Sequence, residues 1–227
     1  MKRILDYILP ILFLFVTISM NGQNNVTKNR IPLYVTPVYQ FDPLDINVGD
    51  CSKMLTSLDI NNYKETVGYF STNIDLIPIE AIFVLSVRLY DIGKKDEAIY
   101  WFYTAQAKGK IFIKMLDPEK IGGIGSRAFE LRQMFISFNR LAGEYINGYA
   151  GGNLEVYLGV CERLLKEIVD FKPVFSIYPN VSFLPDSNRP SILEKQIVGI
   201  QKLMAYIEGN KDEIIRKRKE AGIEGLY

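Results

Sequence analysis

The stretch that decides the fold is residues 81–109, which read AIFVLSVRLYDIGKKDEAIYWFYTAQAKG. Its first half stops before Gly93 and has apolar residues four positions apart, at Ala81, Leu85 and Leu89. This spacing places apolar side chains on one face of a helix, and glycine suits the left-handed conformation that follows a helix. The sequence therefore predicts an amphipathic helix over Ile79–Ile92 with a tight turn after it.

The second half of the stretch predicts another helix, over about Asp96–Lys108. Asp96 and Glu97 stand in its first turn, where the helix dipole favours negative charge. Small and aromatic residues then recur on one side, at Ala98, Trp101, Phe102 and Ala105. We expect the two helices to form an antiparallel hairpin, with the apolar run 111–113 extending the second helix by a turn before Pro118.

The same stretch resembles a Sel1-like repeat, a relative of the tetratricopeptide (TPR) repeat. The residues that carry the resemblance are Leu89-Tyr90, Gly93, Asp96, Ala98, Trp101-Phe102, Ala105 and Gly109. The resemblance covers one unit, residues 81–109, and is closer in the second helix than in the first. It implies a helical scaffold for protein partners, often in the bacterial envelope. The alternative is a well-packed hairpin in a unique all-α domain, because repeat proteins typically need three or more units to bury a continuous core.

Further helices are predicted after the hairpin. Ser126 is placed to cap a long helix from Arg127 to about Asn147, with a buried stripe of Phe129, Met134, Phe138, Leu141 and Tyr145. We expect Gly148–Gly152 to break the chain and Asn153 to cap a helix that runs to about Asp170. These two helices form a second expected hairpin.

The segments before and after these hairpins are also predicted to form helices. Short ones are expected near Lys53–Leu58 and Tyr63–Phe70. Ser191 and Glu194 form a capping box for a helix to Glu208, and a charged helix follows to about Glu220. The fold class is therefore all-α, with about seven helices in antiparallel hairpins in a single domain over residues 51–227.

The first 22 residues follow the order of a secretory signal. Met1-Lys2-Arg3 is basic, the run from Ile8 to Ile18 is almost purely apolar, and small and polar residues follow. Eleven apolar residues with a proline among them are too few for the roughly 20 of a membrane-spanning helix. We expect residues 1–22 to be a cleaved signal peptide and the protein to be periplasmic or secreted, with no stable membrane span after removal. The alternative is an uncleaved signal anchor that tethers the chain to the membrane.

Two segments are predicted to lack regular structure. Residues 23–50 contain three closely spaced prolines and read as an extended arm. Residues 171–190 contain four prolines, and yet they are rich in apolar and aromatic side chains. Structureless loops of this length are uncommon in compact domains, so this loop either packs on the helices or presents a binding edge.

Aromatic side chains in the hairpin and the loop are the candidate partner-binding residues. In the hairpin, four consecutive aromatics must point in several directions on a helix, so at least one ring is expected at the surface, although the core is the default for Trp101. The candidates are Tyr100, Trp101, Tyr103, Phe175, Tyr178 and Phe183. They would line the concave side of the hairpin together with the loop.

The two cysteines, Cys51 and Cys161, have two interpretations. In an oxidising compartment they can form a disulfide bond, whereas Cys161 within an apolar helical pattern also suits a buried thiol. Two cysteines in a chain without histidine are too few for a zinc site, so no metal is expected. No cofactor is expected either.

Composition argues against the commonest catalytic sites and against nucleic acid. The chain has no histidine, which removes Ser-His-Asp and Cys-His nucleophile pairs. Its net charge is +1, so no basic field attracts a polyanion. Glu130 and Glu144 lie about 21 Å apart along the predicted helix, too far for a paired-carboxylate site. The glycine-rich loop at residues 122–126 lacks the lysine-threonine ending of a nucleotide-binding loop, and no strand clearly precedes it.

We therefore expect an exported helical protein that works through protein contacts, as an envelope scaffold or an immunity-type inhibitor, and not as an enzyme. Two alternatives stay open. One is a carboxylate-dependent enzyme acting on envelope glycans or peptidoglycan, which would need two carboxylates within about 10 Å and raised pKa values. The other is a structural subunit of an envelope assembly, which would need a large exposed apolar patch.

Overall fold

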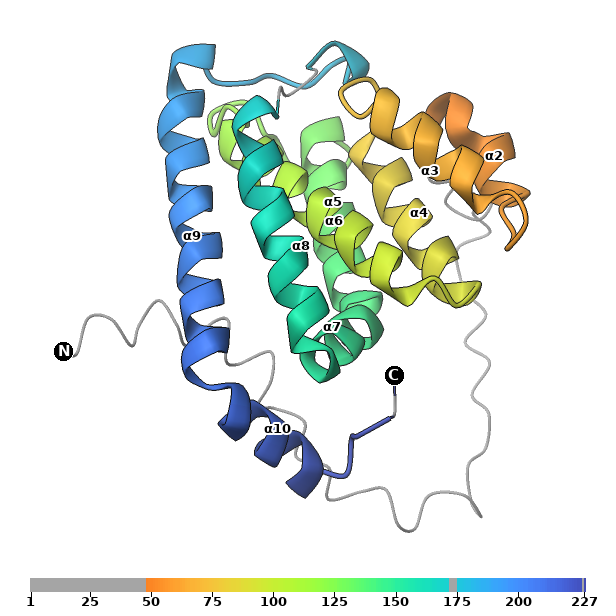
Figure 1. Cartoon of the computed structure of the whole chain (residues 1–227). Helices are drawn as coiled ribbons and strands as arrows, with labels where there is room; N and C mark the ends of the chain where they lie inside the picture. The colour runs from red at the N-terminus through yellow and green to blue at the C-terminus, as the bar shows by residue number, and fades with distance from the viewer. Residues whose placement is uncertain (1–47, 172–174, 226) are drawn as a thin grey trace, which may run out of the picture. The chain divides into compact units, whose positions relative to one another are not determined.

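The computed structural model describes residues 48–171, 175–225 and Tyr227, which together are almost entirely helical (Figure 1). The all-α fold class is confirmed. The α-helices of this part of the chain are α2 (Ser52–Thr56), α3 (Tyr63–Thr72), α4 (Ile79–Asp91), α5 (Lys95–Met115), α6 (Arg127–Leu141), α7 (Gly143–Gly152), α8 (Leu154–Glu167), α9 (Arg189–Gly209) and α10 (Lys211–Glu220). Short 3-10 turns lie at η2 (Gly49–Cys51), η3 (Ile168–Asp170), η4 (Phe175–Ile177) and η5 (Asp186–Asn188).

The predictions for the N-terminal segments fall outside this description. The signal peptide at residues 1–22 and all but the end of the arm at residues 23–50 are not among the described residues. Within the described residues, no helix combines the length and apolar character that crossing a bilayer requires.

Helices α4 and α5 pack on each other more extensively than any other described pair. The turn between them forms as the sequence predicts, because Gly93 has φ +79° and the N–H of Lys94 donates to the carbonyl of Leu89 at 2.8 Å. Helix α5 continues to Met115, and Ile111 and Phe112 are buried. The expected extension of this helix is therefore present and longer than one turn.

Helix α5 is the centre of the fold. It contacts α4, α6, α7, α8 and α9, and buried residues occur on every side of it (Figure 1). A helix that is apolar all round belongs in a core, whereas a repeat in a solenoid contacts only its sequence neighbours. The contacts of α5 with α6, α7, α8 and α9 argue against an open concave face on the α4–α5 pair.

The helix predicted over residues 127–147 is divided in two, α6 and α7. Ser126 caps α6 as predicted, because its Oγ accepts the N–H of Phe129 at 3.4 Å. The boundary lies at Ala142, where Gly143 approaches the Phe102 ring of α5. The predicted break at residues 148–152 is wrong, because these residues belong to α7.

The predicted buried stripe of α6 is also shifted. Leu141 is 72% exposed and Tyr145 is 56% exposed, while Phe129, Met134 and Phe138 are only half-buried. The residues that enter the core are Ala128, Leu131 and Phe135. The Phe135 ring lies against Gly109 of α5 and meets the Phe112 ring edge to face at 5.5 Å.

The proline-rich loop packs on the helices. The N–H of Asp117 donates to the carbonyl of Ser182 at 3.0 Å, and the N–H of Leu184 donates to the carbonyl of Met115 at 2.7 Å. These bonds form an isolated antiparallel bridge between Leu116 and Phe183 at the end of α5. Of the two interpretations of the loop, the structure therefore favours packing for the part from 175 onward.

Candidate functional site

The aromatic residues predicted to bind a partner lie mostly in the core. Trp101 is 1% exposed and meets Phe70 edge to face at 5.9 Å, and Tyr178 is 5% exposed. Tyr100 and Tyr103 are each 9% exposed. Because all four side chains are buried, they belong to the core, and this burial argues against the prediction that they form a docking surface.

The last two candidates belong to the loop. The half-buried Phe183 ring meets Phe112 of α5 edge to face at 5.2 Å, so it helps to hold the loop in place. Phe175 lies in η4, and its side chain is outside the described part of the structure.

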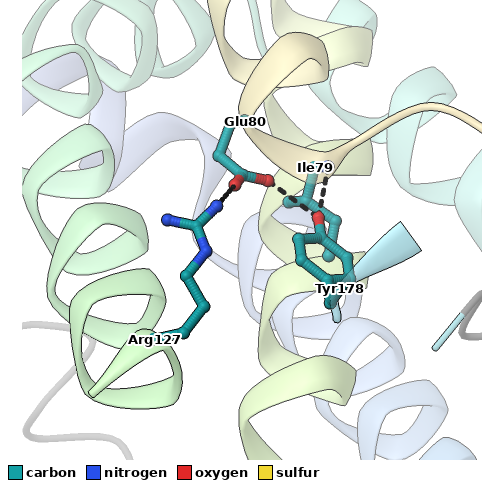
Figure 2. Close-up of polar contacts among 4 residues, drawn as sticks. All are labelled: Ile79, Glu80, Arg127 and Tyr178. Carbon is teal, nitrogen blue, oxygen red and sulfur yellow. Dashed lines mark hydrogen bonds and ion pairs between the residues drawn. The ribbon is translucent and has the colours of Figure 1, made fainter. Parts of the chain in front are cut away.

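A buried polar network joins the loop to α4 and α6 (Figure 2). The Tyr178 hydroxyl donates to Oε2 of Glu80 at 2.7 Å and accepts the N–H of Ile79 at 2.7 Å. Arg127 donates to Oε1 of Glu80 at 3.3 Å, and Glu80 itself is 1% exposed. The first N–H groups of a helix have no partner within the helix, so Tyr178 satisfies one of these donors in α4.

The chemistry of this network is structural. Burial raises the pKa of Glu80, and the hydrogen bonds from backbone and Tyr178 and the charge of Arg127 oppose that rise. The neighbours of this carboxyl group are a tyrosine and an arginine and not the second carboxylate that a glycan-cleaving pair requires. The network explains how the loop is fastened, and it gives the enzyme alternative no support.

The cysteines are both free and both buried. Burial raises the pKa of Cys161 to about 12 and also raises the pKa of Cys51. This agrees with the interpretation of two apolar, unreactive thiols and not with the disulfide. Among the described residues, no group of three or more His, Cys, Asp or Glu could hold a metal ion.

A surface site that the sequence did not predict lies where the α4–α5 turn meets α7. The Tyr90 ring of α4 meets the Tyr149 ring of α7 edge to face at 6.4 Å. The Lys95 ammonium lies 5.0 Å from the centre of the Tyr90 ring and 5.2 Å from that of Tyr149. The Tyr149 hydroxyl donates to Oδ1 of Asp96 at 3.0 Å, so both charged residues at the start of α5 help to position these rings.

Two more tyrosines extend this site. Tyr145 lies one helical turn before Tyr149. The Tyr227 ring meets the Tyr145 ring edge to face at 6.3 Å. Burial raises the pKa of Tyr90, and the nearby hydroxyls of Tyr227 and Tyr145 add to the rise. We call Tyr90, Tyr145, Tyr149 and Tyr227 the tyrosine cluster. They come from α4, α7 and the segment after α10, and each is at least partly exposed.

The tyrosine cluster has the chemistry of a contact surface. Tyrosine offers a broad apolar ring, a hydroxyl that donates and accepts, and few rotatable bonds, which is why it is frequent at protein interfaces. The sequence analysis missed the site because Tyr145 was assigned to a buried stripe and residues 148–152 to a loop. The presence of tyrosine at 145 and 149, one helical turn apart, was the available signal.

Comparisons with known proteins give one relative and no family. No protein-family model matches the chain, and no solved structure matches it. An uncharacterized protein of Haemophilus influenzae is 27% identical over 157 residues, which are 67% of this chain. The match covers 58% of that relative, so this chain corresponds to somewhat more than half of its length.

Proposed function

We propose that this chain is an exported protein that acts by binding another protein, and that the tyrosine cluster is its binding surface. The observation that carries the proposal is the gathering of four partly exposed tyrosines from three separate segments, with Lys95 lying over the rings of Tyr90 and Tyr149 and with Tyr227 against Tyr145. Residues that dominate the binding energy of interfaces are enriched in tyrosine, and they cluster. Export is supported by the order of basic, apolar and small residues in 1–22.

The resemblance of residues 81–109 to a Sel1-like repeat supports the same class of function, a helical scaffold for protein partners. In this proposal the α4–α5 pair acts as a frame and not as the contact face. Its turn supplies Tyr90, Lys95 and Asp96 to the cluster, while its aromatic core holds the turn in place.

Photo-crosslinking tests the binding surface. A benzophenone amino acid replaces Tyr145 in the full chain, expressed in its own cells, and cross-linked products are identified by mass spectrometry. The matched control carries the same group at Tyr206 of α9, which is 38% exposed and lies outside the cluster. We expect one protein to be cross-linked from position 145, absent from position 206, and lost when Tyr149→Ala is added.

Equal products from both positions, or none from position 145, would contradict the proposed surface. Export is tested separately by the mass of the protein purified from its cells. We expect a chain that begins near residue 23, whereas an intact Met1 would contradict cleavage.

A further inference from the structure

Helix α10 and the residues after it are held to the rest of the domain by few contacts. We call residues 211–225 together with Tyr227 the strap. Helix α10 has no buried residue, and two of its ion pairs, Arg216 with Glu220 and Lys217 with Glu213, lie within the helix itself. The pair that reaches another helix, Lys211 with Glu155 of α8, is solvent-exposed. Exposed pairs of this kind contribute little to stability because water and salt screen them, so they hold the strap weakly.

The first close contact of the strap with α7 is made by Arg218. A Cβ on Gly151 would lie 3.2 Å from Nη1 of Arg218, and one on Gly152 would lie 3.1 Å from Nη2. The guanidinium therefore rests on backbone that only glycine exposes. The same group donates to the carbonyl of Ile223 at 3.4 Å, which turns the chain after α10 back toward α7.

The second close contact is made by Tyr227. A Cβ on Gly148 would lie 2.6 Å from the Tyr227 ring, closer than real contacts of this kind. The ring thus lies flat on the glycine, and its edge meets Tyr145 of the tyrosine cluster. The strap covers part of the surface that we assign to the partner, while Tyr145 stays 56% exposed.

The glycines of α7 are explained by their contacts with the strap and not by helix propensity. Glycine in a helix interior is destabilising relative to alanine, and α7 has it at positions 148 and 151, both of which contact the strap. Gly159 of α8 and Gly199 of α9 have no atom within 4 Å of an added Cβ. Close approach of Tyr227 and Arg218 therefore accounts for glycine in α7, and no such approach occurs at the other two.

We propose that the strap is a releasable cover of the three cluster tyrosines on α4 and α7 (Tyr90, Tyr145 and Tyr149), and that Tyr227 leaves them with the strap so that the partner can bind. The inference rests on the proposed function, because the strap controls access to that same surface. Segments with few buried contacts open locally at a much lower free energy than the whole domain. Release needs the separation of Tyr227 and Arg218 from α7, the loss of one exposed ion pair between helices, and the exposure of Ile214, which is only partly buried against the core.

Hydrogen exchange of the full chain tests release without reference to any partner. In Gly148→Ala the new methyl group displaces the Tyr227 ring, while alanine favours the α7 helix, so the domain should stay folded. We expect exchange of amides in 218–225 to rise about tenfold or more, with α4 and α5 unchanged. Gly199→Ala on α9 is the matched control and should leave the exchange of the strap as it is in the wild type.

Two exchange results would overturn the inference. One is equal exchange of the strap in Gly148→Ala and the wild type. The other is a simultaneous loss of protection in α4 and α5, which would make the strap an integral part of the core.

Cross-linking from position 145 tests the covering role. We expect Gly148→Ala to increase the yield of the partner adduct several-fold over the wild type, and Gly199→Ala to leave the yield unchanged. A strap that is released in the exchange experiment without any increase in yield overturns the covering role. Absence of a specific adduct in every variant overturns the proposed function instead, and the exchange data still decide whether the strap opens.

Discussion

The hydroxyl of Tyr178 donates a hydrogen bond of 2.7 Å to the carboxylate of Glu80, across 98 positions of sequence. The same oxygen accepts the N–H of Ile79, so one side chain serves both a buried acid and the start of α4. The loop that carries Tyr178 is thereby fixed to the centre of the domain.

Removal of this hydroxyl should destabilise the fold. Tyr178→Phe leaves the ring in place against Phe112 but deprives Glu80 of a donor and Ile79 of an acceptor. A buried group that loses its partner costs about 1–3 kcal/mol, so we expect the free energy of unfolding in urea to fall by that amount. Tyr206→Phe, at an exposed site, is the control and should change it by less than about 0.5 kcal/mol. Equal effects of the two variants would contradict the network.

Glu80 should make stability depend on pH in a defined direction. Burial raises its pKa above the ordinary 4.5 in the folded protein, so the folded state holds the proton more tightly than the unfolded chain. The stability that this provides is fully present below the ordinary pKa and is lost as pH rises through the raised value. Glu80→Gln cannot lose a proton, so from about pH 4 to about pH 7 the wild type should lose stability relative to this variant. Chemical denaturation at both pH values measures the difference, and a relative gain by the wild type would refute the assignment.

Trp101 should report on the core and not on binding. It is the single tryptophan and is 1% exposed, so its fluorescence should be blue-shifted in the native protein and shift to the red on unfolding. Trp101→Ala should lower the free energy of unfolding by about 3–5 kcal/mol because of the cavity it leaves. Trp101→Phe retains more of the packing and should cost less. A native protein whose tryptophan emission is quenched by iodide as readily as free tryptophan would contradict this burial.

The thiols should be inert while the protein is folded. Since burial raises the pKa of Cys161 to about 12 and raises that of Cys51, little thiolate exists at neutral pH. We expect a thiol reagent to label neither residue in the native state and both residues in denaturant without a reductant. If the cysteines are labelled only when the unfolded protein is also reduced, a disulfide bond is present. The variant Cys161→Ala shows which labelled peptide contains Cys51.

Helices α4 and α5 and the turn between them were predictable because their determinants are local. A four-residue apolar spacing, acidic residues in the first turn of α5 and Gly93 at the turn all act within a few positions. The Ser126 cap of α6 is of the same kind. Neither required knowledge of what the helices touch.

The face of α6 and the ends of α7 were not predictable in that way. Phe135 is buried because its ring packs on Phe112 of α5, whereas Leu141 is exposed, and no pattern within α6 contains that information. The glycines at 148, 151 and 152 read as a break because their contacts lie on Arg218 and Tyr227, about 70 residues later. The tyrosine cluster also depends on long-range contacts, between Tyr90 and Tyr149 and between Tyr145 and Tyr227. The sequence analysis therefore assigned Tyr90 to the repeat-like stretch, Tyr145 to a buried stripe and Tyr149 to a break.

The bond between Tyr178 and Glu80 also has a consequence for the order of folding. Closing a loop of 98 residues carries an entropic cost that grows slowly with length, and it is repaid only when both ends have a defined place. Helices α4 and α5 form from neighbouring residues, so their contacts are the natural early ones. We expect the segment around Tyr178 to pack on α4 afterwards, once α4 and α5 have already assembled.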